Sequence, residues 1–135
     1  MENAPVINIT ARNIAPGIDN ETIDRYRKWN SEAYAPLLMK NPGITGIDHY
    51  DPIRKSPQYP SSCSIQHYEN ITSWRESINS PERQAVTADL IAWVKRGVRE
   101  GVWSAAYELQ QGFREGAPLL GITNDTRISL HYSSR

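Results

Sequence analysis

Three side chains in this sequence have the chemistry to move or donate a proton: Tyr34, His49 and His67. A histidine with a pKa of about 6.5 exchanges a proton near neutral pH, whereas a tyrosine with a pKa of about 10 mainly donates a hydrogen bond. Tyr34 follows an apolar helical face and precedes Pro36, which predicts a kink there and a hydroxyl that can project into a pocket. We predict catalytic roles for these three residues. For Tyr34 the alternative is a packed ring whose hydroxyl bonds to a backbone carbonyl.

The two histidines fall in the two strands of a predicted hairpin. If the hairpin folds symmetrically about Gln58, His49 lies opposite His67. Such a pair could shuttle a proton or, with Asp51 or Glu69, bind a metal ion. A metal site needs three or more converging ligands, and the spacing supplies no third one. We therefore predict acid–base chemistry and no metal site. The alternative is a polar sheet position bonded to water or to a partner protomer.

Other side chains could contact a bound molecule. The chain has seven tyrosines and four tryptophans against one phenylalanine, a balance that favours wet pockets and interfaces over dry cores. Indole and phenol rings can stack on a flat ligand, and amides or carboxylates can orient it, although such residues are more often core or solvated surface. We predict a small hydrophobic or aromatic ligand. The ligand-binding candidates are Trp29, Asn30, Asp89, Trp103 and Tyr107.

The composition limits the classes of protein to which the chain can belong. Its 135 residues fit one domain, and its 15 basic and 15 acidic residues leave no positive excess for a nucleic acid. Cys63 is the single cysteine, so the sequence offers neither an internal disulfide nor a cysteine-based zinc site. No secretory signal begins the sequence, and no segment approaches the roughly 20 apolar residues of a membrane span. We expect a soluble, cytoplasmic protein that binds neither nucleic acid nor membrane.

The elements that position these residues alternate strand and helix. Their order, βαββαβ, predicts an α+β, ferredoxin-like fold with a four-stranded antiparallel sheet and helices on one face. The other face looks partly apolar, so we expect a second copy to cover it and form a homodimer. The predicted strands span residues 6–12, 44–53, 62–69 and 102–109; one helix begins at Asp19 or Asn20 and kinks near Tyr34, and a second helical region begins at Thr72 or Ser73 and restarts at Pro81.

The domain is predicted to span residues 1–115. Residues 116–135 form a C-terminal tail of small and polar residues with scattered leucines. A short strand over residues 127–132 is an option for this tail, which could then contact the partner protomer.

Two separated motifs carry a family resemblance. The segment YRKWNSEAYAPL (residues 26–37), followed by PGI (residues 42–44), resembles the EthD-like branch of the dimeric α+β barrel proteins. Downstream, SPERQA (residues 80–85) and ADL (residues 88–90) are similar to that family's Ser-Pro-Glu and Ala-Asp segments. The family usually has a histidine where this chain has Tyr34 and a second aromatic residue where it has Asn30. An acid–base role of that histidine therefore does not pass unchanged to Tyr34.

The resemblance implies a dimer with a pocket between sheet and helices in each protomer. It also implies a cofactor-independent lyase or isomerase acting on a small aromatic, lactone or polyketide-like molecule, with no cofactor. Two alternatives stay open, since a fold does not specify a reaction. One is a non-catalytic dimer that binds a small hydrophobic ligand. The other is a haem-binding or oxygen-using monooxygenase of the same fold.

Overall fold

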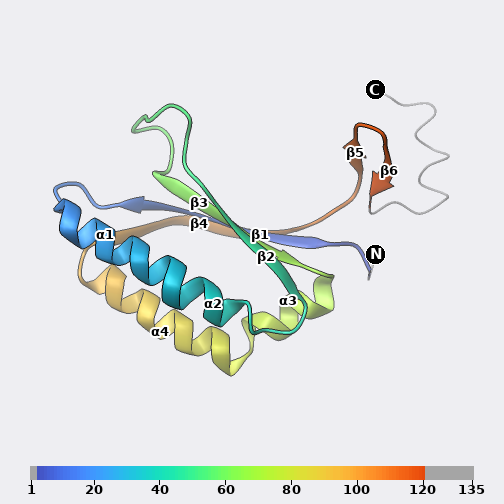
Figure 1. Cartoon of the computed structure of the whole chain (residues 1–135), viewed down its shortest axis with the longest axis horizontal. Coiled ribbons are helices and arrows are strands. Elements are labelled where there is room, and N and C mark those ends of the chain that lie inside the picture. Colours follow the sequence, from blue (N-terminus) through green and yellow to red (C-terminus); the bar gives the residue numbers. More distant parts are fainter. Residues whose placement is uncertain (1–2, 121–135) are drawn as a thin grey trace.

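The computed structural model describes residues 3–120 and shows a four-stranded antiparallel sheet with helices on one face (Figure 1). The strand order is β2-β3-β1-β4, so β1 and β3 are the central strands. This arrangement confirms the predicted ferredoxin-like fold. The strands of the sheet are β1 (Val6–Ile14), β2 (Ile44–Tyr50), β3 (Ser62–Tyr68) and β4 (Arg99–Glu108). The helices are α1 (Asn20–Trp29), α2 (Ala35–Leu38), α3 (Ile71–Ile78) and α4 (Pro81–Lys95).

A separate hairpin follows β4. It consists of β5 (Gly112–Arg114) and β6 (Ala117–Leu120), which pair only with each other in the part of the chain that is described (Figure 1). The predicted domain boundary at residue 115 falls inside this hairpin and stays a prediction. The strand considered over residues 127–132 lies outside the described residues.

Helix starts are set by short polar side chains, as the sequence indicates. The Asp19 carboxylate accepts a hydrogen bond from the Thr22 backbone N–H at 2.7 Å and caps α1. Ser80 Oγ accepts from the Arg83 backbone N–H at 3.1 Å and caps α4, with Pro81 in the first helical position. These two predicted starts are confirmed, whereas the start predicted at Thr72 or Ser73 is wrong: α3 begins at Ile71, and the Asn70 side chain caps it by accepting from the Ser73 backbone N–H at 2.9 Å.

The kink predicted near Tyr34 takes the form of a π-helical turn, η1 (Asn30–Tyr34), between α1 and α2. The backbone N–H of Ala35 bonds to the carbonyl of Asn30, five residues back, rather than four. Pro36 follows and has no N–H to contribute to the next helical turn. The wider turn accommodates the proline, and both Asn30 and Tyr34 reach side chains of the sheet from it.

The prediction that His49 lies opposite His67 is wrong. His49 pairs with Ser64 on β3, and His67 pairs with Gly46 on β2. The pairing differs from the prediction by three residues, and an odd shift moves a side chain to the other face of a sheet. The physical cause lies in the hairpin itself: β2 ends at Tyr50 and β3 begins at Ser62, so the long connection between them is not symmetric about Gln58.

The two faces of the sheet differ in character. A compact apolar cluster of Val6, Leu38, Ile44 and Tyr68 holds the helices against one end of the sheet. Elsewhere the helix-covered face of β1 and β3 carries polar side chains that are nonetheless buried: Asn8, Arg12, Ser64 and Gln66. Burying hydrogen-bonding groups costs free energy unless they are paired. Their presence therefore indicates that this part of the interior has a role besides packing the helices on the sheet.

The helix-free face carries large exposed rings. Tyr50, Trp103 and Tyr107 are 50%, 48% and 52% exposed, next to half-buried Ile7 and Ile9 on β1. This is the partly apolar open face that the sequence predicts. Among the described residues, no helix is long and apolar enough to cross a membrane.

Candidate functional site

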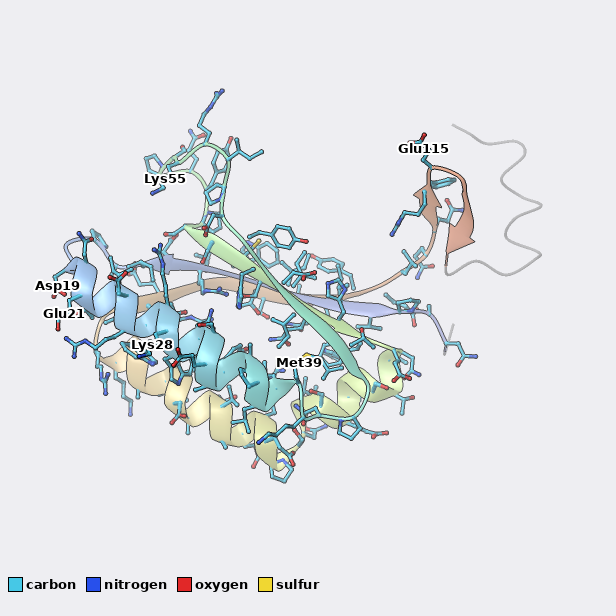
Figure 2. The ribbon with its side chains drawn as sticks, viewed as in Figure 1. Asp19, Glu21, Lys28, Met39, Lys55 and Glu115 are labelled. Carbon is cyan, nitrogen blue, oxygen red and sulfur yellow. The ribbon has the colours of Figure 1, made fainter. Side chains whose placement is uncertain are left out.

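A cleft lies between α1 and the end of the sheet where β2 leads into its long loop. It has an inner cavity of about 340 Å³ and an outer cavity of about 500 Å³, which share Ile14, Arg27, Asp51 and Ser61 in their walls. The outer cavity is lined largely by the loop, from which Lys55 projects away from the sheet (Figure 2). The inner cavity is lined by residues of β1, α1, β2 and β3.

His49 stands in the wall of the inner cavity with both ring nitrogens in contact with neighbours. Nδ1 lies 2.8 Å from Ser64 Oγ and 3.2 Å from Arg12 Nη2, and Nε2 lies 3.3 Å from the Asn30 amide nitrogen. A guanidinium only donates, so in the neutral ring Nδ1 must be the acceptor. The Asn30 NH2 group also only donates, so a proton on Nε2 requires that amide to turn its Oδ1 toward the ring, where it accepts the Nε2–H.

The electrostatic surroundings keep this imidazole neutral. Burial lowers the pKa of His49, and the nearby charge of Arg12 lowers it further, while Asp48 and Asp51 act weakly in the opposite direction. The ring is thus an uncharged N–H donor at neutral pH. A neutral imidazole of this kind can polarise a carbonyl oxygen without first losing a positive charge.

Arg12 is the most confined charge in the site, at 5% exposed. Its Nη1 donates to Ser64 Oγ, so it holds both the serine and the histidine in place. Its pKa is lowered chiefly by burial, and the charge of Arg99 acts in the same direction. Two buried atoms here lack a hydrogen-bond partner among the described residues: Arg12 Nε and Tyr26 Oη.

A second polar cluster surrounds Tyr34. Its hydroxyl oxygen accepts from Gln66 Nε2 at 2.9 Å, while Gln66 Oε1 accepts from Tyr68 Oη at 2.8 Å and from Arg83 Nη1 at 3.1 Å. The arginine can only donate, which fixes the orientation of the amide and leaves the hydroxyl hydrogen of Tyr34 uncommitted. Burial raises the pKa of Tyr34, so the phenol stays protonated. Tyr34 is not among the residues that line the inner or the outer cavity.

Of the catalytic and ligand-binding candidates, the structure brings His49 and Asn30 together in the inner cavity. Trp29, next to Asn30 in the chain, does not line the inner cavity and packs in an aromatic cluster, 5.4 Å from the ring of Tyr34 and 5.9 Å from that of Tyr26. The roles of these residues stay predictions, but their places are compatible with one site.

The remaining candidates lie elsewhere. His67 is on the helix-free face, where its Nε2 lies 2.8 Å from Asp48 Oδ2. Trp103 and Tyr107 are on the same face, paired with residues of β1, and Asp89 is exposed on α4. None of these four residues lines the inner cavity. Within residues 3–120, no group of three or more His, Cys, Asp or Glu side chains is placed to hold a metal ion.

Sequence reasoning missed Arg12, Tyr26 and Arg99. A signal was present in β1, where polar Asn8, Thr10 and Arg12 alternate with apolar residues. That alternation identifies one polar face, but only the paired strands show that this face is the buried one.

Comparison with models of protein families gives no match, and comparison with curated proteins gives none either. Solved structures do match. An ethyl tert-butyl ether D (EthD) family protein from Bacillus halodurans is 14% identical with a TM-score of 0.55, over 79% of this chain and 99% of that one. SnoaB from Streptomyces nogalater, a cofactor-independent oxygenase, is 14% identical with a TM-score of 0.54, over 82% and 97%. A dimeric ferredoxin-like protein from Thermobifida fusca is 10% identical with a TM-score of 0.55, over 81% and 99%.

These likenesses confirm the expected fold. The chain has the ferredoxin-like α+β fold of the EthD-like dimeric barrel proteins.

Proposed function

We propose that the chain is a cofactor-independent lyase or isomerase that moves a proton on a small aromatic, lactone or polyketide-like molecule in the inner cavity. The observation that supports this most is the fixed ring of His49, whose Nδ1 accepts from Arg12 and Ser64 and whose Nε2 lies beside Asn30 in the cavity wall. A pre-oriented donor of this kind stabilises charge that develops on a carbonyl oxygen during deprotonation of the adjacent carbon.

Asp51 is the proton acceptor in this proposal. It is an exposed residue that contributes to the walls of both cavities, and its carboxylate oxygens can accept a proton from a ligand bound there. The carbon-bound proton passes to Asp51, and its electron pair forms an enolate whose oxygen accepts from His49. Returning the proton to another carbon completes an isomerisation, and expelling a group from the β-carbon completes an elimination. Tyr34 lines neither cavity and His67 lies on the other face, so neither takes part in this step.

Two alternatives differ in the step after binding. The same carbanion could react with O₂, and one similar structure is a cofactor-independent oxygenase. A protein that only binds would show neither reaction.

The test is hydrogen–deuterium exchange at carbon, monitored by NMR in D₂O for a panel of aryl ketones, γ-lactones and β-diketones. The expected result is exchange that falls about 10²- to 10⁴-fold in His49→Gln and in Asp51→Asn, since positioned acids and bases contribute rate factors of that order. His67→Gln is the matched histidine control and should retain exchange. Exchange that is equal in all variants would refute the proposal.

The binding-only alternative predicts a raised melting temperature without exchange for every compound in the panel. Products that form in air but not under argon would indicate the oxygenase instead.

We also propose that the chain forms a homodimer through its helix-free face. Trp103 and Tyr107 are about half exposed there, and an apolar patch of this kind commonly marks an interface. A similar solved structure is described as dimeric, which supports a second copy as the occupant. Light scattering on the purified protein gives the mass directly, and a monomer at micromolar concentration would contradict the proposal.

A further inference from the structure

We propose that the inner cavity contains a subsite for a carboxylate group of the substrate, made by Arg12 and Tyr26 with Arg99 behind them. The inference deepens the proposed function, on which it rests only in placing the ligand in the same cavity.

Two buried donors in the cavity wall are unused. Arg12 and Tyr26 are only 5% and 3% exposed, and both line the inner cavity. Arg12 Nε and Tyr26 Oη have no hydrogen-bond partner among the described residues. Buried polar atoms are almost always paired in native proteins, so each unpaired one requires an explanation. Both atoms can donate, and the missing partner is therefore an acceptor.

Positive charge beside these donors is uncompensated. Arg99 on β4 is 6% exposed, pairs with Ile14 of the cavity wall, and acts electrostatically on Arg12. Among residues 3–120, neither arginine forms an ion pair, and the Arg99 guanidinium makes no hydrogen bond. Buried charges are normally paired because desolvation is costly, so an anionic group of a ligand would be stabilised beside these two arginines.

The donors also indicate the shape of that anion. Arg12 and Tyr26 line the same cavity and interact electrostatically, and a guanidinium N–H together with a phenol O–H can donate to the two oxygens of one carboxylate through strong charge-assisted bonds. Asp51, the acidic residue in the same wall, is exposed and forms no ion pair with Arg12 within the described range, so it does not already serve as the anion. With the carboxylate held here and a carbonyl at His49 Nε2, the substrate class is a small carboxylic acid that also carries a carbonyl or lactone group.

The experiment compares benzoate with benzamide, two ligands of equal shape that differ in charge. Calorimetry on the full chain should show benzoate binding at least tenfold more tightly than benzamide. Tyr26→Phe should weaken benzoate about 3- to 10-fold, as expected for one lost hydrogen bond, and Arg99→Met about tenfold or more. Neither change should alter the weak binding of benzamide.

Arg25→Met is the matched control. Arg25 is an exposed arginine of α1 that pairs with Glu21, so its removal changes the net charge equally but leaves the cavity intact. If benzoate affinity falls as much in Arg25→Met as in Arg99→Met, the loss is explained by long-range charge alone, and the proposal is overturned. Equal binding of benzoate and benzamide would overturn it too and assign the two donors to ordered water. Inorganic phosphate that binds more tightly than benzoate would overturn the assignment to a carboxylate.

The failures of the two proposals can be told apart. Selective benzoate binding without any carbon exchange leaves the subsite and removes the proposed reaction. Exchange of neutral ketones with no preference for carboxylates leaves the reaction and removes the subsite.

Discussion

Replacing Arg99 by methionine should make the ligand-free protein more stable. Arg99 as a whole residue is 6% exposed, and methionine keeps the unbranched apolar stem of its side chain while removing a guanidinium that has no hydrogen bond or ion pair among the described residues. The substitution also removes a like charge from the neighbourhood of Arg12. Most single substitutions at buried positions destabilise a protein, so a gain would be specific evidence for uncompensated charge.

The size of the gain depends on burial. Moving an ion out of water costs several kcal/mol even after relaxation, and exchanging buried ionic groups for apolar ones of similar volume has stabilised proteins by about 1–4 kcal/mol. Because the 6% exposure leaves the guanidinium some contact with water, we expect the lower part of that range, about 1–3 kcal/mol.

The assay is urea unfolding at pH 7.5, with and without saturating benzoate. Wild type should gain stability from benzoate as ligand binding requires, and Arg99→Met should gain little. Arg25→Met should lower the free energy of unfolding by less than about 0.5 kcal/mol, because it removes only an exposed i,i+4 pair. A loss of more than about 1 kcal/mol in Arg99→Met would refute the reasoning, since the guanidinium would then be contributing net favourable contacts.

Three further predictions concern other parts of the molecule. Because the pKa of His49 is lowered by folding, the unfolded chain binds the proton first; stability should fall as the pH drops below about 6.5, and His49→Gln should flatten the pH dependence of the urea midpoint. Gly43→Ala should cost about 2–4 kcal/mol in urea unfolding, because φ is +86° and a Cβ would collide with Ser73. Trp103→Arg should shift light scattering to the monomer mass, whereas Met39→Arg, a similarly exposed side chain on the helical side, should not.

Local sequence signals predict much of this fold for identifiable reasons. Asp19 and Ser80 cap helices through contacts that span three residues, so their effect can be deduced from a short segment. The consequence of Pro36 is also local, and the sequence predicts the kink. Its form is not predictable in the same way, because a π-helical turn depends on how the sheet receives Asn30 and Tyr34.

The partners of the candidate residues could not be predicted from the sequence because they depend on pairing between strands that are far apart in the chain. The register between β2 and β3 depends on a long loop and on the irregularity after Ile44, neither of which has a sequence signature. A displacement of three residues separates His67 from the cavity and joins His49 to Arg12, 37 positions away in the chain. Candidate residues can thus be selected by chemical type, while their partners emerge only once strands are paired.

The alternation along β3 separates two properties that could evolve independently. Ser64 and Gln66 face the helices and the buried polar groups, and Cys63, Ile65 and His67 face outward. Under the two proposals above, neighbouring codons therefore act on different traits: the inward set acts on the groups around the proposed ligand, and the outward set acts on the proposed dimer surface. A mutational library restricted to residues 64 and 66 would therefore vary the buried polar groups that hold His49 and Tyr34, and one restricted to residues 63, 65 and 67 would vary the open face alone.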